Sequence, residues 1–311
     1  MAGITDLPFR ELAWEFGAGA VVAEMTSAKP ELWDTALSRQ RRAMSHAAGP
    51  RIIQVAGGDP QMISDAVQRA EQSGAEIVDI NMGCPAKKVC RRLAGSALLA
   101  DEALVGRILD AAVRATSLPV TLKMRTGSTP EQRNGVSVAR LAEAAGVASL
   151  AVHGRTRSCR FVGEVEYQTI TDIKRAVSLP VFANGDVDNF ASAQAVLRST
   201  GADGLLIGRA ALGAPWLPGD IASGLAAGRA PRVRTPAEVF EIAALHLQRL
   251  HEFYGEQRAV GIARKHVKGY MGRIGLSRVR IQAFTRLETA IAQKDFIARE
   301  RVTASGEDQA A

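Results

Sequence analysis

Short β-type runs and longer helix-type stretches alternate along the first two thirds of the chain. The β-type runs, rich in Val, Ile and Leu, cover residues 20–25, 51–57, 76–83, 120–127, 149–154, 181–186 and 204–210. Between them lie amphipathic stretches of helical period at 60–73, 102–116, 136–145, 167–177 and 189–199. This alternation predicts a parallel sheet wrapped by helices.

Most of the predicted strands end in a small group of polar or glycine residues. These pairs are Gln54 and Gly57, Asn81 and Gly83, Lys123 and Arg125, His153 and Arg155, Asn184 and Asp186, and Gly208 and Arg209. A (β/α)₈ (TIM) barrel carries its chemistry at the carboxyl ends of its strands, so the pattern favours that fold over a doubly wound sheet. Only seven strands are predicted. We therefore interpret Met1-Ala-Gly as the loop after a first strand that the sequence lacks.

The pattern changes near residue 228, where a linker-like stretch rich in Gly, Pro and Arg begins. Only helical periods follow it, at 236–253, 257–274 and 279–293. We therefore divide the chain into a barrel domain at 1–228, a helical domain at 236–300 and a disordered tail at 301–311.

Composition narrows the class of protein. No apolar run approaches the roughly 20 residues that cross a bilayer, and the first residues are too charged for a secretory signal. Three cysteines in irregular positions argue against a disulfide framework or a zinc site. We expect a cytoplasmic monomer that binds neither membrane nor metal.

The excess of positive charge is concentrated in one stretch. The chain has a net charge of +7 and a pI of about 9.7. From 257 to 287 there is no Asp or Glu, and eight basic residues occur there: Arg258, Arg264, Lys265, Lys268, Arg273, Arg278, Arg280 and Arg286. With His266 and Tyr270 interleaved, the stretch is typical of a track for RNA phosphates, the alternative being a solvated helix face.

Cys84 is the leading candidate for chemistry, since it follows a buried strand and precedes two lysines. A thiol with the reference pKa of about 8.5 is protonated at neutral pH and suits a general acid. It would serve as a nucleophile if Lys87 or Lys88 lowered that pKa. The alternative is a buried structural cysteine.

Other polar residues at the strand ends suggest anionic ligands. Lys123 alternates with apolar neighbours, so if it lies inside the barrel it needs an anionic or carbonyl partner, such as a cofactor ring, Asp79 or Glu24. The arginines after His153 suit phosphate oxygens. The glycines in Asn184-Gly185-Asp186 and Gly208-Arg209 would allow a phosphate to approach the backbone, a device that sugar-phosphate barrels share.

Several ordered blocks together resemble the bacterial tRNA-dihydrouridine synthases, most closely the B type. They are Met1-Ala-Gly-Ile-Thr-Asp-Leu-Pro-Phe-Arg10, Gln54-Val-Ala-Gly57, Asn81-Met-Gly-Cys-Pro-Ala-Lys-Lys-Val89, Lys123-Met-Arg-Thr-Gly127, Val152-His-Gly-Arg-Thr-Arg157, Ala183-Asn-Gly-Asp-Val187 and Ile207-Gly-Arg-Ala-Ala211. They span nearly the whole chain in the family's order.

The resemblance implies an FMN-binding barrel followed by a helical tRNA-binding domain, with NADPH as the electron donor. The implied FMN contacts are Met1, Ala2, Gln54, Lys123, His153, Asn184, Gly185, Asp186, Gly208 and Arg209. Asn81 is implied at the flavin or the uracil, and Arg264, Lys265 and His266 on the tRNA-facing helices. We also expect Arg155 to contact the substrate. Cys84 is implied as the proton donor.

The implied reaction saturates the C5=C6 bond of a uracil in tRNA. Hydride from the reduced flavin would add at C6, and Cys84 would protonate C5. The target base would have to leave its stack to reach the barrel. The family's first strand is not in the sequence, which leads us to expect weak retention of FMN. Three other interpretations stay open: a flavin barrel acting on a free pyrimidine, a phosphate-binding lyase or isomerase using Lys123 as a Schiff base, and a non-catalytic RNA-binding protein.

Overall fold

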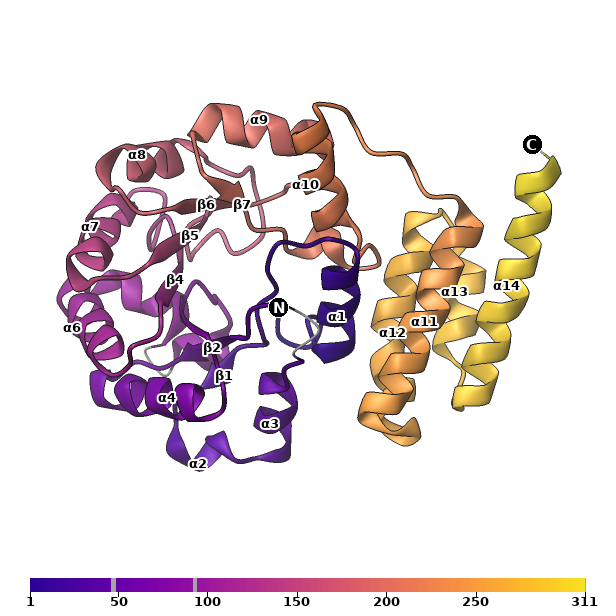
Figure 1. The fold of residues 1–311 in the computed structure, drawn as a ribbon, viewed down its shortest axis with the longest axis horizontal. Coiled ribbons are helices and arrows are strands. Elements are labelled where there is room, and N and C mark those ends of the chain that lie inside the picture. Colours follow the sequence, from indigo (N-terminus) through magenta and orange to yellow (C-terminus); the bar gives the residue numbers. More distant parts are fainter. Residues whose placement is uncertain (46–48, 92–93, 311) are drawn as a thin grey trace. The chain divides into compact units, whose positions relative to one another are not determined.

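A single parallel sheet forms the centre of the first part of the chain (Figure 1). The computed structural model describes residues 1–45, 49–91 and 94–310, and describes only the backbone at 306–310. The strands, adjacent in chain order, are β1 (Thr26–Ser27), β2 (Ile52–Ala56), β3 (Ile77–Met82), β4 (Val120–Arg125), β5 (Ser149–His153), β6 (Val181–Asn184) and β7 (Gly204–Leu205). The predicted α/β barrel architecture is confirmed.

The first strand lies later than predicted. The sequence placed it at 20–25, where only an isolated bridge from Val22 to Ile52 and a bond from Ala23 N to Ile52 O (3.0 Å) occur. Regular pairing begins at β1 because Thr26 and Ser27 are the residues in register with the end of β2.

The helices of this part lie around the sheet in Figure 1. They are α2 (Pro30–Trp33), α3 (Ala36–Arg42), α4 (Pro60–Gln72), α5 (Lys87–Cys90), the 3₁₀ helix η1 (Gly95–Ala100), α6 (Glu102–Arg114), α7 (Gly135–Ala145), α8 (Gln168–Ala176) and α9 (Phe190–Thr200). Local sequence fixes where several of them begin. Asp59 and Asp101 accept a bond from the third residue of α4 and α6, and Asn189 forms a capping box on α9.

Side chains alternate along the strands between an apolar and a polar face. On β4, Leu122 and Met124 are fully buried, and apolar residues at equivalent positions of the other strands are buried as well. We assign these positions to the side packed against the helices. Lys123 and Arg125 alternate with them and belong to the opposite, interior face. This face carries the polar groups that the sequence placed at the strand ends.

The second compact unit comprises residues 8–18 and the chain from 209 onward. Its elements are α1 (Leu7–Glu15), the 3₁₀ helix η2 (Arg209–Ala211), α10 (Leu217–Ala227), α11 (Pro236–Tyr254), α12 (Glu256–Arg273), α13 (Arg278–Thr285) and α14 (Ala290–Ala310). The unit begins earlier than the boundary predicted near 228. The reason is packing, since Phe16 and Trp216 join Val239 and Tyr270 in one hydrophobic cluster.

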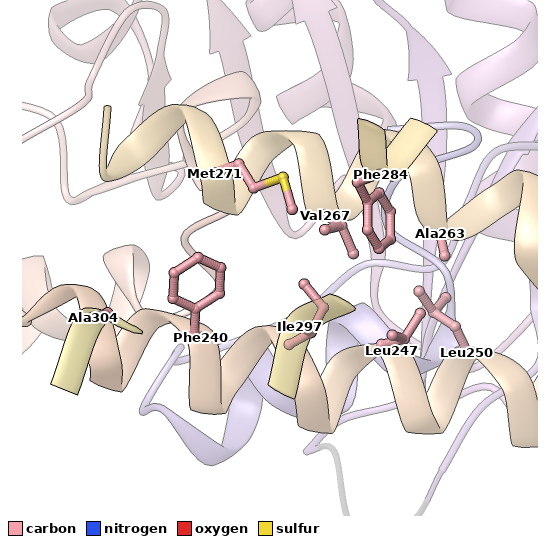
Figure 2. Close-up of a cluster of buried hydrophobic side chains, with 9 residues drawn as sticks. All are labelled: Phe240, Leu247, Leu250, Ala263, Val267, Met271, Phe284, Ile297 and Ala304. Atoms are coloured by element: carbon pink, nitrogen blue, oxygen red, sulfur yellow. The ribbon is translucent and has the colours of Figure 1, made fainter. Parts of the chain in front are cut away.

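Four helices of this unit share a hydrophobic core (Figure 2). Its buried members are Phe240, Leu247, Leu250, Ala263, Val267, Met271, Phe284, Ile297 and Ala304. The chain is helical beyond residue 301, where the sequence predicted a disordered tail. Ala304 is buried in the core and Glu300 pairs with Arg280, and these interactions favour continuing α14.

The helix predicted at 279–293 is two helices, α13 and α14. The break is stabilised on both sides. Thr289 Oγ1 accepts a bond from Ala292 N (3.2 Å) at the start of α14, and Leu287 O accepts one from Arg264 Nη2 (3.0 Å). Across the described residues, no helix combines the length and apolar character that a membrane span requires. The cytoplasmic location stays a prediction.

Candidate active site

The register of the sheet brings the predicted polar residues into neighbouring positions at the carboxyl ends of the strands. Asn81 of β3 is in register with Lys123 of β4, and His153 of β5 lies between Arg125 of β4 and Asn184 of β6. Gln54 of β2 is in register with Asp79, which lies two residues before Asn81 on β3. The polar strand ends therefore form one site on the interior face.

The backbone of Cys84 is held on both sides. Its N–H donates to Asn81 Oδ1 (3.0 Å), and its carbonyl accepts from Ser96 N (3.0 Å) and Ser96 Oγ (2.9 Å). Cys90 Sγ also donates to that carbonyl at 3.5 Å. These bonds fix the backbone of Cys84, and the residue is partly exposed.

Arg125 ties the Cys84 loop to the loop after β5. The side chain is 1% exposed and donates to Gly83 O (2.7 Å), Thr156 O (2.9 Å) and Arg160 O (2.7 Å). Burial lowers its pKa to about 10. Electrostatic interaction with Cys84 opposes this shift, and interactions with Cys159 and Cys90 oppose it less strongly. The sequence marks Arg125 as a polar residue at the end of its strand but implies no contact with cofactor or substrate for it. Its spacing of two from Lys123 on the same strand was the available signal.

Lys123 is a cation in a poorly solvated position. Burial and, to a lesser extent, Arg125 lower its pKa to about 7, and the charge of Asp79 opposes the shift. In the described part of the chain, its Nζ makes no ion pair with Asp79 or Glu24, the two carboxylates considered from the sequence. Asp79 instead accepts bonds from Gln54 Nε2 (2.7 Å) and Thr121 Oγ1 (2.6 Å).

Arg155 and Asp186, predicted to contact substrate and cofactor, bind each other. Arg155 Nη1 donates to Asp186 Oδ1 at 3.1 Å, and Nη2 donates to Asp186 Oδ2 and to Gly163 O (2.6 Å). Arg155 is 4% exposed. Because most of its fork is occupied, its first role is to join the loops after β5 and β6. His153 is also buried, with its ring centroid 6.3 Å from that of Phe161.

The ends of β6 and β7 differ in how open they are. Asn184 Nδ2 donates to Leu206 O (2.7 Å), and Gly185 (φ 140°) would press an added Cβ to 2.7 Å from Val165. Packing therefore explains this glycine. Among the residues that the structure describes, an added Cβ at Gly208 would meet only Met1 Sδ, at 3.9 Å, so Met1 and Gly208 lie together beside open space. Arg209 is exposed at the start of η2.

The N-terminal residues form a turn. Met1 O accepts bonds from the N–H groups of Ile4 and Thr5, both at 3.0 Å, and Gly3 N donates to the buried Glu24. Ala2 is exposed on this turn.

The three residues predicted on the tRNA-facing helices differ in exposure. Lys265 is exposed, Arg264 is partly buried, and His266 is 1% exposed. The His266 ring lies 4.6 Å from that of His246, and Tyr270, which the sequence also placed in the basic track, is buried. His266 and Tyr270 face the core because they fall on the same side of α12 as Ala263 and Val267. This side is not the exposed basic surface.

The fold and site define a barrel enzyme with a cysteine and a lysine at the carboxyl ends of adjacent strands. The family model for dihydrouridine synthases matches residues 1–304. The chain belongs to the dihydrouridine synthase family, whose function is flavin-dependent reduction of uridine in tRNA.

Curated relatives agree over nearly the full length. The chain is 53% identical over 293 residues to tRNA-dihydrouridine synthase B of Pseudomonas aeruginosa, with 94% of this chain and 88% of that protein covered. It is 50% identical over 313 residues to the protein of the same name from Pseudomonas putida, with 99% and 93% covered. A solved structure of 6-hydroxypseudooxynicotine amine oxidase from Pseudomonas geniculata matches with TM-score 0.47 and 17% identity, covering 76% of this chain and 47% of that one. This last likeness adds nothing to the assignment.

Proposed function

We propose that this chain reduces a uridine in tRNA to 5,6-dihydrouridine, with FMN held on the interior face of the barrel and NADPH as electron donor. The observation that carries the proposal is Cys84, held by its backbone at the end of β3 beside Asn81 and Lys123. The family match over 1–304 supports the reaction class. The names of the relatives support tRNA as the substrate.

The residues of the site fit a flavin. Lys123 carries a desolvated charge that an electron-rich ring edge or a carbonyl would stabilise. Gln54 and Asn184 offer amide groups on the same face, and the space beside Gly208 suits a group that approaches the backbone. Met1, Ala2, His153, Gly185, Asp186 and Arg209 complete the proposed FMN contacts.

Within this proposal, Cys84 supplies the proton. When bound, the flavin supplies the hydride that adds to uracil C6. The negative charge that develops at C5 and O4 is quenched when the Cys84 thiol transfers its proton to C5, which leaves a thiolate. The buried guanidinium of Arg125 interacts electrostatically with Cys84 and would stabilise that thiolate. Asn81 and Arg155 are proposed at the uracil, and Arg264, Lys265 and His266 on the helices that receive the tRNA.

The decisive experiment follows the flavin spectrum anaerobically. Protein reconstituted with FMN should bleach on addition of NADPH and recover its colour with unmodified tRNA, yielding dihydrouridine detectable by mass spectrometry. Free uridine should not restore the colour. Turnover of the free base would instead indicate a free-pyrimidine reductase. Failure to bind FMN, together with borohydride trapping of a carbonyl substrate on Lys123, would indicate a Schiff-base enzyme.

Replacing the thiol should separate the two half-reactions. We expect Cys84→Ala to lower the rate of dihydrouridine formation by about 10²- to 10⁴-fold, the range typical of a lost general acid. Reduction of the flavin by NADPH should continue. Cys90→Ala is the matched control, because that thiol contacts the Cys84 carbonyl and Ser96 Oγ and has no proposed part in the proton transfer. Equal losses in the two variants would contradict the role of Cys84.

A further inference from the structure

Asp79 is a buried carboxyl group to which the proposed reaction gives no role. It lies on β3, is 6% exposed, and is in register with Gln54 of β2 and Thr121 of β4. Both neighbours donate to it, Gln54 Nε2 to Oδ2 at 2.7 Å and Thr121 Oγ1 to Oδ1 at 2.6 Å. Lys123 is the charged group facing it from β4. A carboxyl group buried at such a cost invites the question of what it organises.

From Asp79 the hydrogen bonds continue without interruption to the backbone of Cys84. Gln54 Oε1 accepts from Asn81 Nδ2 at 2.9 Å. Asn81 Oδ1 in turn accepts from Gly83 N at 3.2 Å and from Cys84 N at 3.0 Å. Strands β3 and β2 thus contribute alternate members of one hydrogen-bond chain, which ends at the proposed proton donor.

The groups at the two ends of this hydrogen-bond chain fix the direction of every hydrogen bond in it. A carboxylate only accepts, so Gln54 must turn its amide N–H toward Asp79 and its oxygen toward Asn81. Backbone N–H groups only donate, so Asn81 must turn its oxygen toward Gly83 and Cys84. Both requirements give the same arrangement. Either amide turned the other way would place two donors, or two acceptors, face to face.

We propose that Asp79 is a positioning residue that, through Gln54 and Asn81, sets the direction of both amides and holds the backbone N–H of Cys84 in place. The inference rests on the proposed function only for the importance of Cys84. Ser96 holds the carbonyl side of Cys84 independently. The hydrogen-bond chain from Asp79 therefore positions the backbone N–H of Cys84.

Hydrogen exchange of the Gly83 and Cys84 amides tests this directly. We expect Asp79→Ala in the full-length protein to speed exchange at these two amides about tenfold, because Gln54 loses the acceptor that orients it. Asp172→Asn is the matched control. Asp172 also accepts from a glutamine, Gln168 Nε2 at 2.9 Å, but this pair is exposed on α8. The control should leave both amides unchanged.

Asp79→Asn tests whether the orientation of Gln54, and not the size or charge of residue 79, controls exchange at the two amides. Its side-chain oxygen can still accept from Gln54 while its NH₂ donates to Thr121 Oγ1, since a hydroxyl also accepts. Exchange at Gly83 and Cys84 should then stay close to that of the unmodified protein. Exchange as fast in Asp79→Asn as in Asp79→Ala would overturn the proposal.

A second variant covers the case in which Asp79→Ala unfolds. Gln54→Met keeps the length of the side chain and removes its hydrogen bonds, so it should expose the same two amides. Unchanged exchange at Gly83 and Cys84 in Gln54→Met would also overturn the proposal. None of these readouts needs tRNA, NADPH or FMN. A failure of the proposed function would appear in tRNA reduction and a failure of this inference in amide exchange.

Discussion

Two cations on β4, separated by one residue, differ in whether the protein provides partners for their charge. Arg125 donates to three backbone carbonyls, so its cost of burial is offset within the protein. Lys123 has no such partner in the described part of the chain, and its pKa falls to about 7. Arg125 therefore has a structural role in the site, whereas Lys123 is available to a ligand.

This difference predicts how stability depends on pH. The folded pKa of Lys123, about 7, lies below its ordinary value, so above pH 7 the unfolded chain binds more protons and stability rises with pH. At pH 6 the native state bears the full cost of the buried charge. We expect Lys123→Met to raise the Tm of flavin-free protein at pH 6 by about 2 to 6 °C. The gain should shrink at pH 9, where the native lysine is neutral.

The same substitution should weaken FMN binding, since it removes the charge that the ligand would stabilise. Lys174→Met is the control, because Lys174 Nζ lies 2.7 Å from Asp203 Oδ2 and its removal breaks an ion pair instead. Calorimetry at both pH values checks the stability, and titration of FMN fluorescence checks the affinity. A lower Tm for Lys123→Met at pH 6 would show that an anion of the protein already compensates Lys123.

At the scale of elements, the sequence predicted the features that depend on local pattern, which are the positions of most strands and the faces of their side chains. A strand occurs within six of the seven predicted segments, because apolar alternation and polar ends mark them independently, whereas the first strand begins after its predicted range of 20–25. The alternation also identifies Lys123 and Arg125 as one face of β4. It could not reveal that Thr156 and Arg160 supply carbonyls to Arg125, since these contacts depend on how distant loops fold.

The errors in the helical region have a physical cause as well. Residues 258, 261, 265, 268 and 272 form the exposed stripe of α12, whereas His266 and Tyr270 lie on the buried side. A count of basic residues does not resolve the two faces, although the helical period of 3.6 does. The break between α13 and α14 depends on a cap at Thr289 and on the bond from Arg264 to Leu287 O, and neither is a strong sequence signal.

Two glycines of α12, one beside open space and one packed against another segment, give an element-scale prediction. An added Cβ at Gly261 meets no atom of the described residues within 4 Å, so Gly261→Ala should stabilise the protein by about 0.5 to 1 kcal/mol through helix propensity alone. Gly269 is the matched control in the same helix. Its Cβ would lie 2.9 Å from Gly213 N, and Gly269→Ala should destabilise by about 1 to 3 kcal/mol. Urea unfolding of both variants checks the opposite signs.

At the scale of the whole molecule, the positive charge is a local property. The segment 257–287 carries eight basic and no acidic residues, and the rest of the chain has 31 basic and 32 acidic residues. A polyanion is therefore attracted to the segment containing α12 and α13 rather than to the protein at large. Arg280 pairs with Glu300 and Arg264 donates to Leu287 O, whereas Lys265 and Lys268 are among the basic residues of the segment that are exposed.

We therefore expect the double variant Lys265→Glu with Lys268→Glu to bind tRNA about 10- to 100-fold more weakly at moderate salt. The slope of log affinity against log salt should fall by about 2, because each phosphate contact contributes about one counterion. Reduction of the flavin by NADPH should be unchanged, since neither lysine belongs to the barrel unit. Fluorescence anisotropy with labelled tRNA over a salt series measures both quantities.

Arg140→Glu provides the control, because this residue is exposed on α7 of the barrel unit and its replacement also reverses a positive charge. If net charge alone attracted the tRNA, each reversal would lower affinity by the same factor wherever it lay. If the α12 stripe contacts phosphates, reversal there should reduce the salt slope, whereas Arg140→Glu should leave it unchanged. Equal slopes in the two variants would exclude α12 as a phosphate contact and move the tRNA to another surface.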